Sequence, residues 1–241
     1  MTTATAPLTG IFPIAPVAFH DDGTLDREGC KRILECMIDQ GVDGICILAN
    51  YSEQFLLDDA ERDAIMTLSM EAVGGRVPVT VTCSHFATRI AAERAKRARE
   101  AGAEMVMLMP PYHGALLKAG EEGIVEHFKA VAEAAEVAIM VQDAPLSGVN
   151  LSVPFLVRLG KEVPLVQYFK IEVPGTAGNL RALIKSGGEA IIGPFDGEEG
   201  ITLMADLDAG ATGTMTSALM PDLIRPIVTE FLAGNLAEAR R

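Results

Sequence analysis

One lysine and one glutamate, two positions apart, are the side chains best placed to do covalent chemistry. Lys170 ends the apolar run Leu165–Lys170, and Glu172 follows it. Side chains two positions apart in a strand point to the same face, so both should face one interior or its mouth. A partly desolvated amine favours its uncharged form, whose lone pair can attack a carbonyl carbon, and an adjacent carboxylate could move protons. The structural alternatives are a lysine that reaches solvent and a Lys170–Glu172 salt bridge.

Other candidate residues also stand at the ends of apolar runs. We expect Gln142 and Tyr112 in the catalytic set, although Tyr112 could equally be an aromatic residue of the rim. Five more residues are expected to contact substrate: Asn50, Tyr51, Ser52, Asp196 and Met215. The carboxyl ends of barrel strands are where active-site residues gather, so the pattern predicts one shared site.

Eight strand-like runs alternate with helical patterns along the chain. The strands are expected at Phe12–Ala18, Gly44–Ala49, Val77–Thr82, Met105–Met109, Ala138–Gln142, Leu165–Lys170, Ala190–Gly193 and Gly213–Ser217. The helices are expected at Cys30–Gln40, Leu57–Val73, Thr88–Ala101, Glu121–Ala135, Val153–Gly160, Thr176–Ser186, Glu198–Ala209 and Asp222–Ala233. Nearly all-apolar strands suit a parallel sheet covered on both faces, and the count of eight favours closure. The sequence therefore predicts an α/β protein, a (β/α)8 TIM barrel, as one domain over residues 1–241.

Composition excludes several classes of function. The net charge is −13 with no long basic run, which argues against a nucleic-acid partner. No apolar run reaches the roughly 18 residues of a membrane helix, and no signal peptide is visible, so we expect a cytoplasmic protein. The four cysteines lack metal-ligand spacing and are expected to be buried, reduced thiols. No GxGxxG or GxxxxGK[ST] motif occurs, and we expect neither a metal nor an organic cofactor.

Several motifs resemble those of the dihydrodipicolinate synthase / N-acetylneuraminate lyase superfamily. Ala49–Glu53 matches its G-[ST]-T-G-E motif, Gln142–Pro145 its Y-N-x-P motif, and Phe169–Lys170 the lysine that ends the sixth strand. The likeness is collinear over essentially the whole chain. It implies that Lys170 forms a Schiff base with a 2-keto acid, and that the loop after the second strand binds the keto acid's carboxylate through Tyr51, Ser52 and backbone N–H groups.

The resemblance also carries expectations about assembly and extent. It implies that Tyr112 is the tyrosine that members often lend across a dimer interface, so we expect a homo-oligomer, a dimer or tetramer. Members usually continue past the barrel into further helices, and this C-terminal extension is expected to be absent here.

Three departures from the family pattern concern proton transfer. Gln142 replaces the tyrosine that shuttles protons in the family's aldolases and synthases, and an amide cannot donate and recover a proton as a phenol can. The arginine typical of dihydrodipicolinate synthases is missing after Pro145. In place of K-E-A-T-G stands Lys170–Gly175, which moves the acid to Glu172, on the lysine's own face. These changes favour a dehydratase over an aldolase.

Within the superfamily the pattern is most similar to the dehydratases of 2-keto-3-deoxy sugar acids, those of L-2-keto-3-deoxyarabonate in particular, which yield 2-oxoglutarate semialdehyde. Three alternatives stay open. One is a pyruvate-releasing aldolase of the same fold. Another is a 5-keto-4-deoxyglucarate dehydratase, which would need a cation such as Arg89 for the distal carboxylate. The third is a non-catalytic barrel that binds a keto acid.

Overall fold

The computed structural model describes residues 6–113 and 117–241. Within these residues eight parallel strands form one sheet in the order β1-β10-β9-β8-β7-β4-β3-β2. The strands are β1 (Gly10–Ile11), β2 (Ile45–Ile47), β3 (Val79–Thr82), β4 (Met105–Leu108), β7 (Ala138–Asp143), β8 (Val166–Ile171), β9 (Gly193–Asp196) and β10 (Gly213–Thr214). A separate antiparallel pair joins β5 (Tyr112–His113) and β6 (Leu117–Lys118).

The segment after β1 closes the sheet into a barrel. Ile14 bridges Ser217 on one side and Cys46 of β2 on the other. The Ala15 N–H donates to the Cys46 carbonyl at 2.8 Å, and the Cys46 N–H donates to the Pro13 carbonyl at 2.9 Å. The predicted (β/α)8 barrel is therefore confirmed. The first regular ladder lies earlier than the predicted range 12–18, because prolines 13 and 16 have no N–H with which to continue it.

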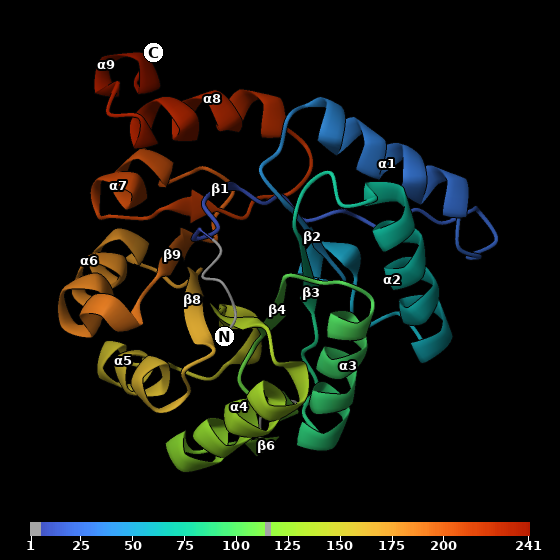
Figure 1. The fold of residues 1–241 in the computed structure, drawn as a ribbon, viewed down its shortest axis with the longest axis horizontal. Coiled ribbons are helices and arrows are strands. Elements are labelled where there is room, and N and C mark those ends of the chain that lie inside the picture. The colour runs from blue at the N-terminus through green and yellow to red at the C-terminus, as the bar shows by residue number, and fades with distance from the viewer. Residues whose placement is uncertain (1–5, 114–116) are drawn as a thin grey trace.

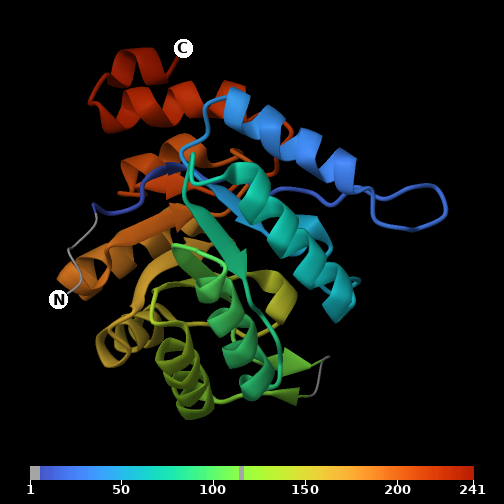
Figure 2. The same cartoon turned by 45° about the vertical axis from the view of Figure 1, so that its right-hand side comes forward.

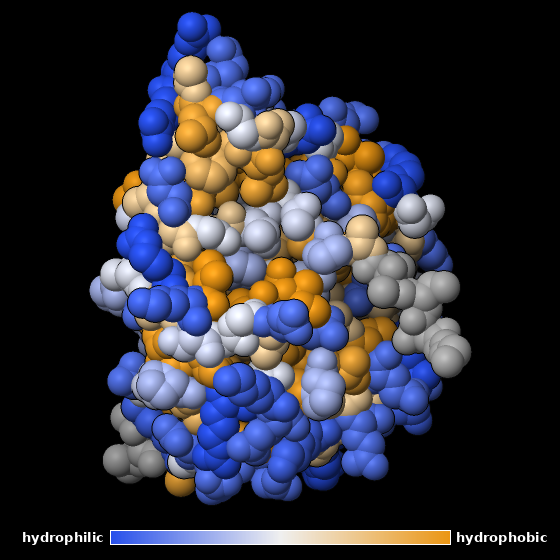
Figure 3. Space-filling model, turned by 60° about the vertical axis from the view of Figure 1, so that its left-hand side comes forward, coloured by the Kyte–Doolittle hydropathy of each residue, from blue (hydrophilic) through white to orange (hydrophobic). Residues whose placement is uncertain are grey.

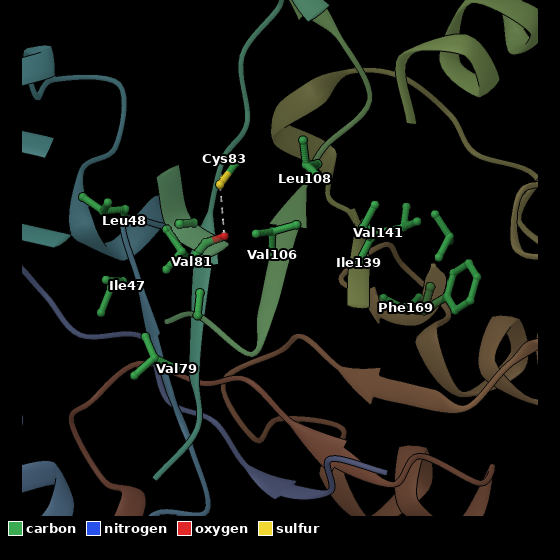
Figure 4. Packing of buried hydrophobic residues seen from close by; sticks show 14 of the residues in the cluster. Ile47, Leu48, Val79, Val81, Cys83, Val106, Leu108, Ile139, Val141 and Phe169 are labelled. Atoms are coloured by element: carbon green, nitrogen blue, oxygen red, sulfur yellow. Dashed lines mark hydrogen bonds between the residues drawn. The ribbon is translucent and has the colours of Figure 1, made fainter. Parts of the chain in front are cut away.

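Alternate side chains of the strands fill two separate layers. The inner layer, enclosed by the barrel, contains Phe12, Ile14, Cys46, Ala49, Met105, Met107, Met140, Tyr168, Phe195 and Met215. The outer layer packs under the helices, and Figure 4 shows Val81, Val106 and Val141 of this layer on β3, β4 and β7. This alternation assigns a direction to every strand residue, including those that carry polar side chains.

Helices surround the barrel, as Figures 1 and 2 show. They are α1 (Arg27–Asp39), α2 (Asp59–Val73), α3 (Thr88–Glu100), α4 (Glu121–Ala135), α5 (Val153–Glu162), α6 (Thr176–Gly187), α7 (Leu203–Asp208), α8 (Pro221–Leu232) and α9 (Leu236–Ala239). Several begin at side-chain caps: the carboxylates of Asp26 and Asp58 and the hydroxyl of Ser152 accept from N–H groups of the first turn. These caps fix where the strand-to-helix loops end.

Some predicted boundaries are wrong for local reasons. Ala190 belongs to a 3₁₀ turn (Gly188–Ala190), so the seventh barrel strand begins at Gly193 instead of Ala190. The following helix starts at Leu203 and not at Glu198, because residues 198–202 form a series of bends before it. Of the four cysteines, Cys36 is exposed and not buried as predicted.

On the face drawn in Figure 3, exposed hydrophobic residues are interspersed among hydrophilic ones. Large hydrophobic side chains that are more than three-fifths exposed to solvent include Leu56, Leu117, Ile201, Leu219 and Leu223. Among the described residues, no helix is both long and apolar enough to cross a membrane.

Candidate active site

The Lys170 side chain lies inside the barrel, paired with Glu172. Lys170 follows Tyr168 on the inner face of β8, while Phe169 and Ile171 point outward to the helices. Its side chain is only 2% exposed, and its Nζ forms an ion pair with Oε1 of Glu172, which is 15% exposed. The predicted inward direction is confirmed, and so is the salt bridge that the sequence left open. A carboxylate in contact with a buried amine is placed to take the proton that the amine must lose before it attacks a ketone.

Gln142 holds the other side of the glutamate. It lies beside Lys170 in the pairing of β7 with β8 and is fully buried. Its Nε2 donates to Oε1 of Glu172 at 3.0 Å, the oxygen that also contacts Lys170. Oε1 of Gln142 has no hydrogen-bond partner among the described residues. Gln142 therefore orients Glu172 and keeps a free acceptor for a hydroxyl or a water.

Gly197 lets the loop after β9 pack directly on the Lys170–Glu172 pair. A Cβ at this position would lie 2.3 Å from Cγ of Glu172 and 3.0 Å from Cγ of Lys170. Distances below 3.0 Å do not occur for real Cβ atoms, so any larger residue must displace these side chains. The sequence shows Gly197 only as one glycine in a D-G-E-E stretch, and this contact was not predicted.

Gly197→Ala should lower kcat/KM by roughly 10–100-fold, because displacement of catalytic groups by about 1 Å can cost that much. Steady-state kinetics of keto-acid turnover would measure it. Gly178→Ala on α6 is the matched control, since nothing lies within 4 Å of its Cβ, and it should leave kinetics unchanged. Equal kinetics of the two variants would contradict this packing argument.

Tyr51 and Glu199 line a cavity of about 340 Å³ at the barrel mouth, together with Ile14 and Ser217. The Glu199 carboxylate accepts from the Ser217 N–H at 2.7 Å and from its hydroxyl at 2.8 Å. Tyr51 is about half exposed, and the partial burial of its hydroxyl, its hydrogen bond with Glu199 and nearby carboxylates raise its pKa to about 12. Tyr51 therefore stays a protonated hydrogen-bond donor at neutral pH. Glu199 is a site candidate that the sequence placed after a strand but did not select.

Ser52 and Asn50 support the loop that carries Tyr51. Ser52 is fully buried; its hydroxyl donates to the Ala15 carbonyl at 2.6 Å and accepts from the Ala49 N–H at 3.1 Å. Asn50 Oδ1 accepts from Nε2 of Gln54 at 2.7 Å. Ser52 thus fixes the loop to the segment after β1, and Asn50 braces it from within, so contact with substrate through the Ser52 hydroxyl would require its bonds to change.

The other predicted binding residues lie in different surroundings. Asp196 is fully buried, and its carboxylate accepts from the Thr214 hydroxyl at 2.7 Å and from the Glu198 N–H at 2.9 Å. Met215 is fully buried in the inner layer. Tyr112 lines a separate cavity of about 390 Å³, with its ring 6.4 Å from that of Phe55. The structure thus brings together Lys170, Glu172 and Gln142, with Tyr51 at the mouth.

Asp143 is a buried acid that the sequence left outside the candidate set. It is 2% exposed, and its Oδ1 has no hydrogen-bond partner among the described residues. Burial, and secondarily the charge of Glu172, raise its pKa to about 7. Its place directly after Gln142 at the end of β7 was the signal available in the sequence. Asp143 is therefore a second buried carboxyl near the site, and its charge interacts with that of Glu172.

The whole of this arrangement lies within a match to one known family. The sequence model of the Dihydrodipicolinate synthetase family matches residues 7–241. The chain belongs to this family. Among curated relatives, the L-2-keto-3-deoxyarabonate dehydratase of Azospirillum brasilense is 53% identical over 240 residues, 99% of this chain and 78% of that protein. A 4-hydroxy-tetrahydrodipicolinate synthase of Sorangium cellulosum is 31% identical over 237 residues, 97% and 77% of the two chains.

Solved structures of the dihydrodipicolinate synthetase family share the fold. A prophage protein of E. coli from this family, solved in complex with pyruvate, superposes with a TM-score of 0.89 at 25% identity, covering 96% of this chain and 78% of that one. A 4-hydroxy-tetrahydrodipicolinate synthase of Methylacidiphilum fumariolicum gives 0.88 at 27% identity, covering 96% and 76%. The chain is accordingly an enzyme of this lyase superfamily, and its likeness to the Azospirillum protein supports a dehydratase.

Proposed function

We propose that this enzyme dehydrates L-2-keto-3-deoxyarabonate to 2-oxoglutarate semialdehyde through a Schiff base on Lys170, in cytoplasmic pentose catabolism. The observation that carries the proposal is the buried Lys170–Glu172 pair, oriented by Gln142. The Azospirillum relative of that activity supports the substrate. A glutamine where a phenol would act in an aldolase supports dehydration over carbon–carbon cleavage.

The reaction begins with proton transfer from Lys170 to Glu172. The free amine attacks the C2 ketone, and Glu172 gives its proton to the departing hydroxyl, so loss of water leaves a protonated imine that acts as an electron sink. Glu172, deprotonated again, removes a C3 proton, and the enamine expels the C4 hydroxyl as water with that proton. A C5 proton then leaves and C3 is reprotonated, which gives an enol that becomes the aldehyde. Hydrolysis restores the lysine, so the net change is loss of one water.

Within this scheme the other groups bind and orient. Tyr51, as a protonated donor, can hold the substrate carboxylate once it releases Glu199. The carbonyl oxygen of Gln142 can accept from the leaving hydroxyl or from the water. Asp143, whose pKa burial raises to about 7, interacts with the charge of Glu172 from the end of β7.

A six-carbon diacid is the less favoured substrate. Its distal carboxylate would need a cation, and Arg89 was the candidate in the sequence. Arg89 lines a cavity between α2 and α3 together with Val81 and Cys83. These two residues belong to the outer layer, on the helix side of the barrel wall, so Arg89 is not placed beside Lys170 and Glu172. This placement favours a substrate whose far end carries a hydroxyl.

Product analysis separates dehydration from cleavage. With L-2-keto-3-deoxyarabonate, the enzyme should form an aldehyde that 2-oxoglutarate semialdehyde dehydrogenase oxidises, and lactate dehydrogenase should detect no pyruvate. Stoichiometric pyruvate would establish the aldolase alternative. Reversible keto-acid binding without either product would establish the non-catalytic one.

We also propose a homo-oligomer. Tyr112 stands on the β5 strand of the hairpin, partly exposed beside the exposed rings of Phe55 and Phe86. An aromatic cluster of this kind suits a contact between subunits, as the family resemblance of Tyr112 implies.

A further inference from the structure

Two buried acids, Asp196 and Asp206, lie next to the loop of residues 196–199, which follows β9. Asp196 ends β9, Asp206 lies on α7, and both side chains are fully buried. The two carboxyl groups are close enough that a hydrogen bond with Asp196 affects the pKa of Asp206. Two carboxylates cannot make this bond without a proton between them, and two uncompensated buried charges would repel at high cost.

The other hydrogen bonds of the two carboxyl groups show which oxygen atom can carry a shared proton. Asp196 accepts from the Thr214 hydroxyl at 2.7 Å and from the Glu198 N–H at 2.9 Å. Asp206 Oδ2 accepts from the Thr202 hydroxyl at 2.5 Å, and its Oδ1 has no hydroxyl or N–H donor among the described residues. Asp206 Oδ1 is therefore the atom left to share a proton with Asp196.

The pair anchors the loop that covers the reactive residues. Residues 196–199 include Gly197, which packs on Lys170 and Glu172, and Glu199, which bonds Ser217 and Tyr51. The bond from the Glu198 N–H to Asp196 is the direct link between this loop and the buried acids. A shift of Asp196 would therefore move both Gly197, which packs on Lys170, and Glu199, which lines the cavity at the barrel mouth.

We propose that Asp196 and Asp206 share one proton and serve as a positioning pair, which holds the 196–199 loop against Lys170 and Glu172. The inference goes beyond the proposed reaction, although its kinetic readout rests on the Schiff base of that proposal. Neither acid is a catalytic residue, because both are enclosed between β9, β10 and α7 and act through the loop.

The charges around the pair set the direction of its pH dependence. Burial is the main cause that raises the pKa of Asp196, to about 6, and the pKa of Asp206. In the described part of the chain, Asp206 on α7 and Lys170 on β8 are the charged side chains that act on Asp196, and Asp196 is the one that acts on Asp206; Thr202 and Thr214 are neutral. The pair therefore gives up its proton as the pH rises, and the loop should loosen in the same direction.

Asp206→Asn tests the shared proton, because the amide donates to Asp196 permanently and does not titrate. The rate at which borohydride traps pyruvate on Lys170 should be close to wild type near pH 5.5. The ratio of variant to wild-type rate should then rise by about tenfold toward pH 9, roughly the value of one charge-assisted hydrogen bond. Asp206→Leu, which cannot make the bond, should trap more slowly than both at every pH. A ratio that is flat with pH overturns the proposal, whatever the leucine variant does.

Thermal unfolding of wild type and Asp206→Asn tests the pair without substrate. A carboxyl whose pKa is raised by folding binds its proton more tightly in the native state, so its contribution to stability falls as the pH rises above its unfolded value. The Tm of Asp206→Asn minus the Tm of wild type should therefore increase between pH 5 and pH 8. If the Tm difference changes with pH in this way but the protein traps no pyruvate, the shared proton is supported and the proposed function is contradicted. A Tm difference that does not change with pH would contradict the shared proton.

Discussion

Replacing Lys170 with alanine should abolish both turnover and borohydride-dependent trapping of keto acids. The loss in kcat should be on the order of 10⁶-fold, as for other catalytic nucleophiles, because no imine can then form. Steady-state assays and intact-protein mass spectrometry would measure the two effects. Lys185→Ala, an exposed lysine on α6, is the matched control and should behave as wild type. Residual trapping in Lys170→Ala would show that another amine is the nucleophile.

Replacing Glu172 with glutamine should separate imine formation from dehydration. Loss of a general acid/base lowers rates by roughly 10²–10⁴-fold, so kcat should fall by about that factor. The amide keeps the shape of the side chain and can still contact Gln142, so keto acid should still be trapped on Lys170, more slowly than in wild type because Glu172 no longer accepts the proton of the amine. Single-turnover kinetics with L-2-keto-3-deoxyarabonate would resolve the two steps. Glu133→Gln, on the exposed face of α4, controls for the loss of one charge.

Near-normal turnover in Glu172→Gln would remove this residue from proton transfer. Asp143 would then be the next acid to test, because it is buried near Glu172 with a pKa close to neutrality.

The inward direction of Lys170 could be predicted from the sequence because it depends on the pattern of a single strand. The period of two residues places Tyr168 and Lys170 on the same face of β8, and the apolar run shows that this face is buried. The eight-strand alternation likewise required only patterns along the chain. Boundaries failed where a different local interaction prevailed, as at Pro13 in the first strand and the 3₁₀ turn at Ala190.

The contacts between different loops could not be predicted from patterns along the chain. Gly197 meets Lys170 and Glu172, and Tyr51 meets Glu199, only after separate βα units have closed into the barrel. Asp196 illustrates the difference: its position at a strand end predicted substrate contact, whereas the fold turns its carboxylate to Asp206 and Thr214. A residue's place at the barrel mouth does not by itself determine whether its side chain faces substrate or supports a neighbour.

The most direct test of the central claim is peptide mass spectrometry after borohydride reduction in the presence of L-2-keto-3-deoxyarabonate. The account predicts one modified peptide, with the adduct on Lys170 and with a fraction of it lighter by one water, which is the dehydrated imine captured during turnover. Adducts on exposed lysines alone, or an unmodified Lys170 peptide during active turnover, would contradict it.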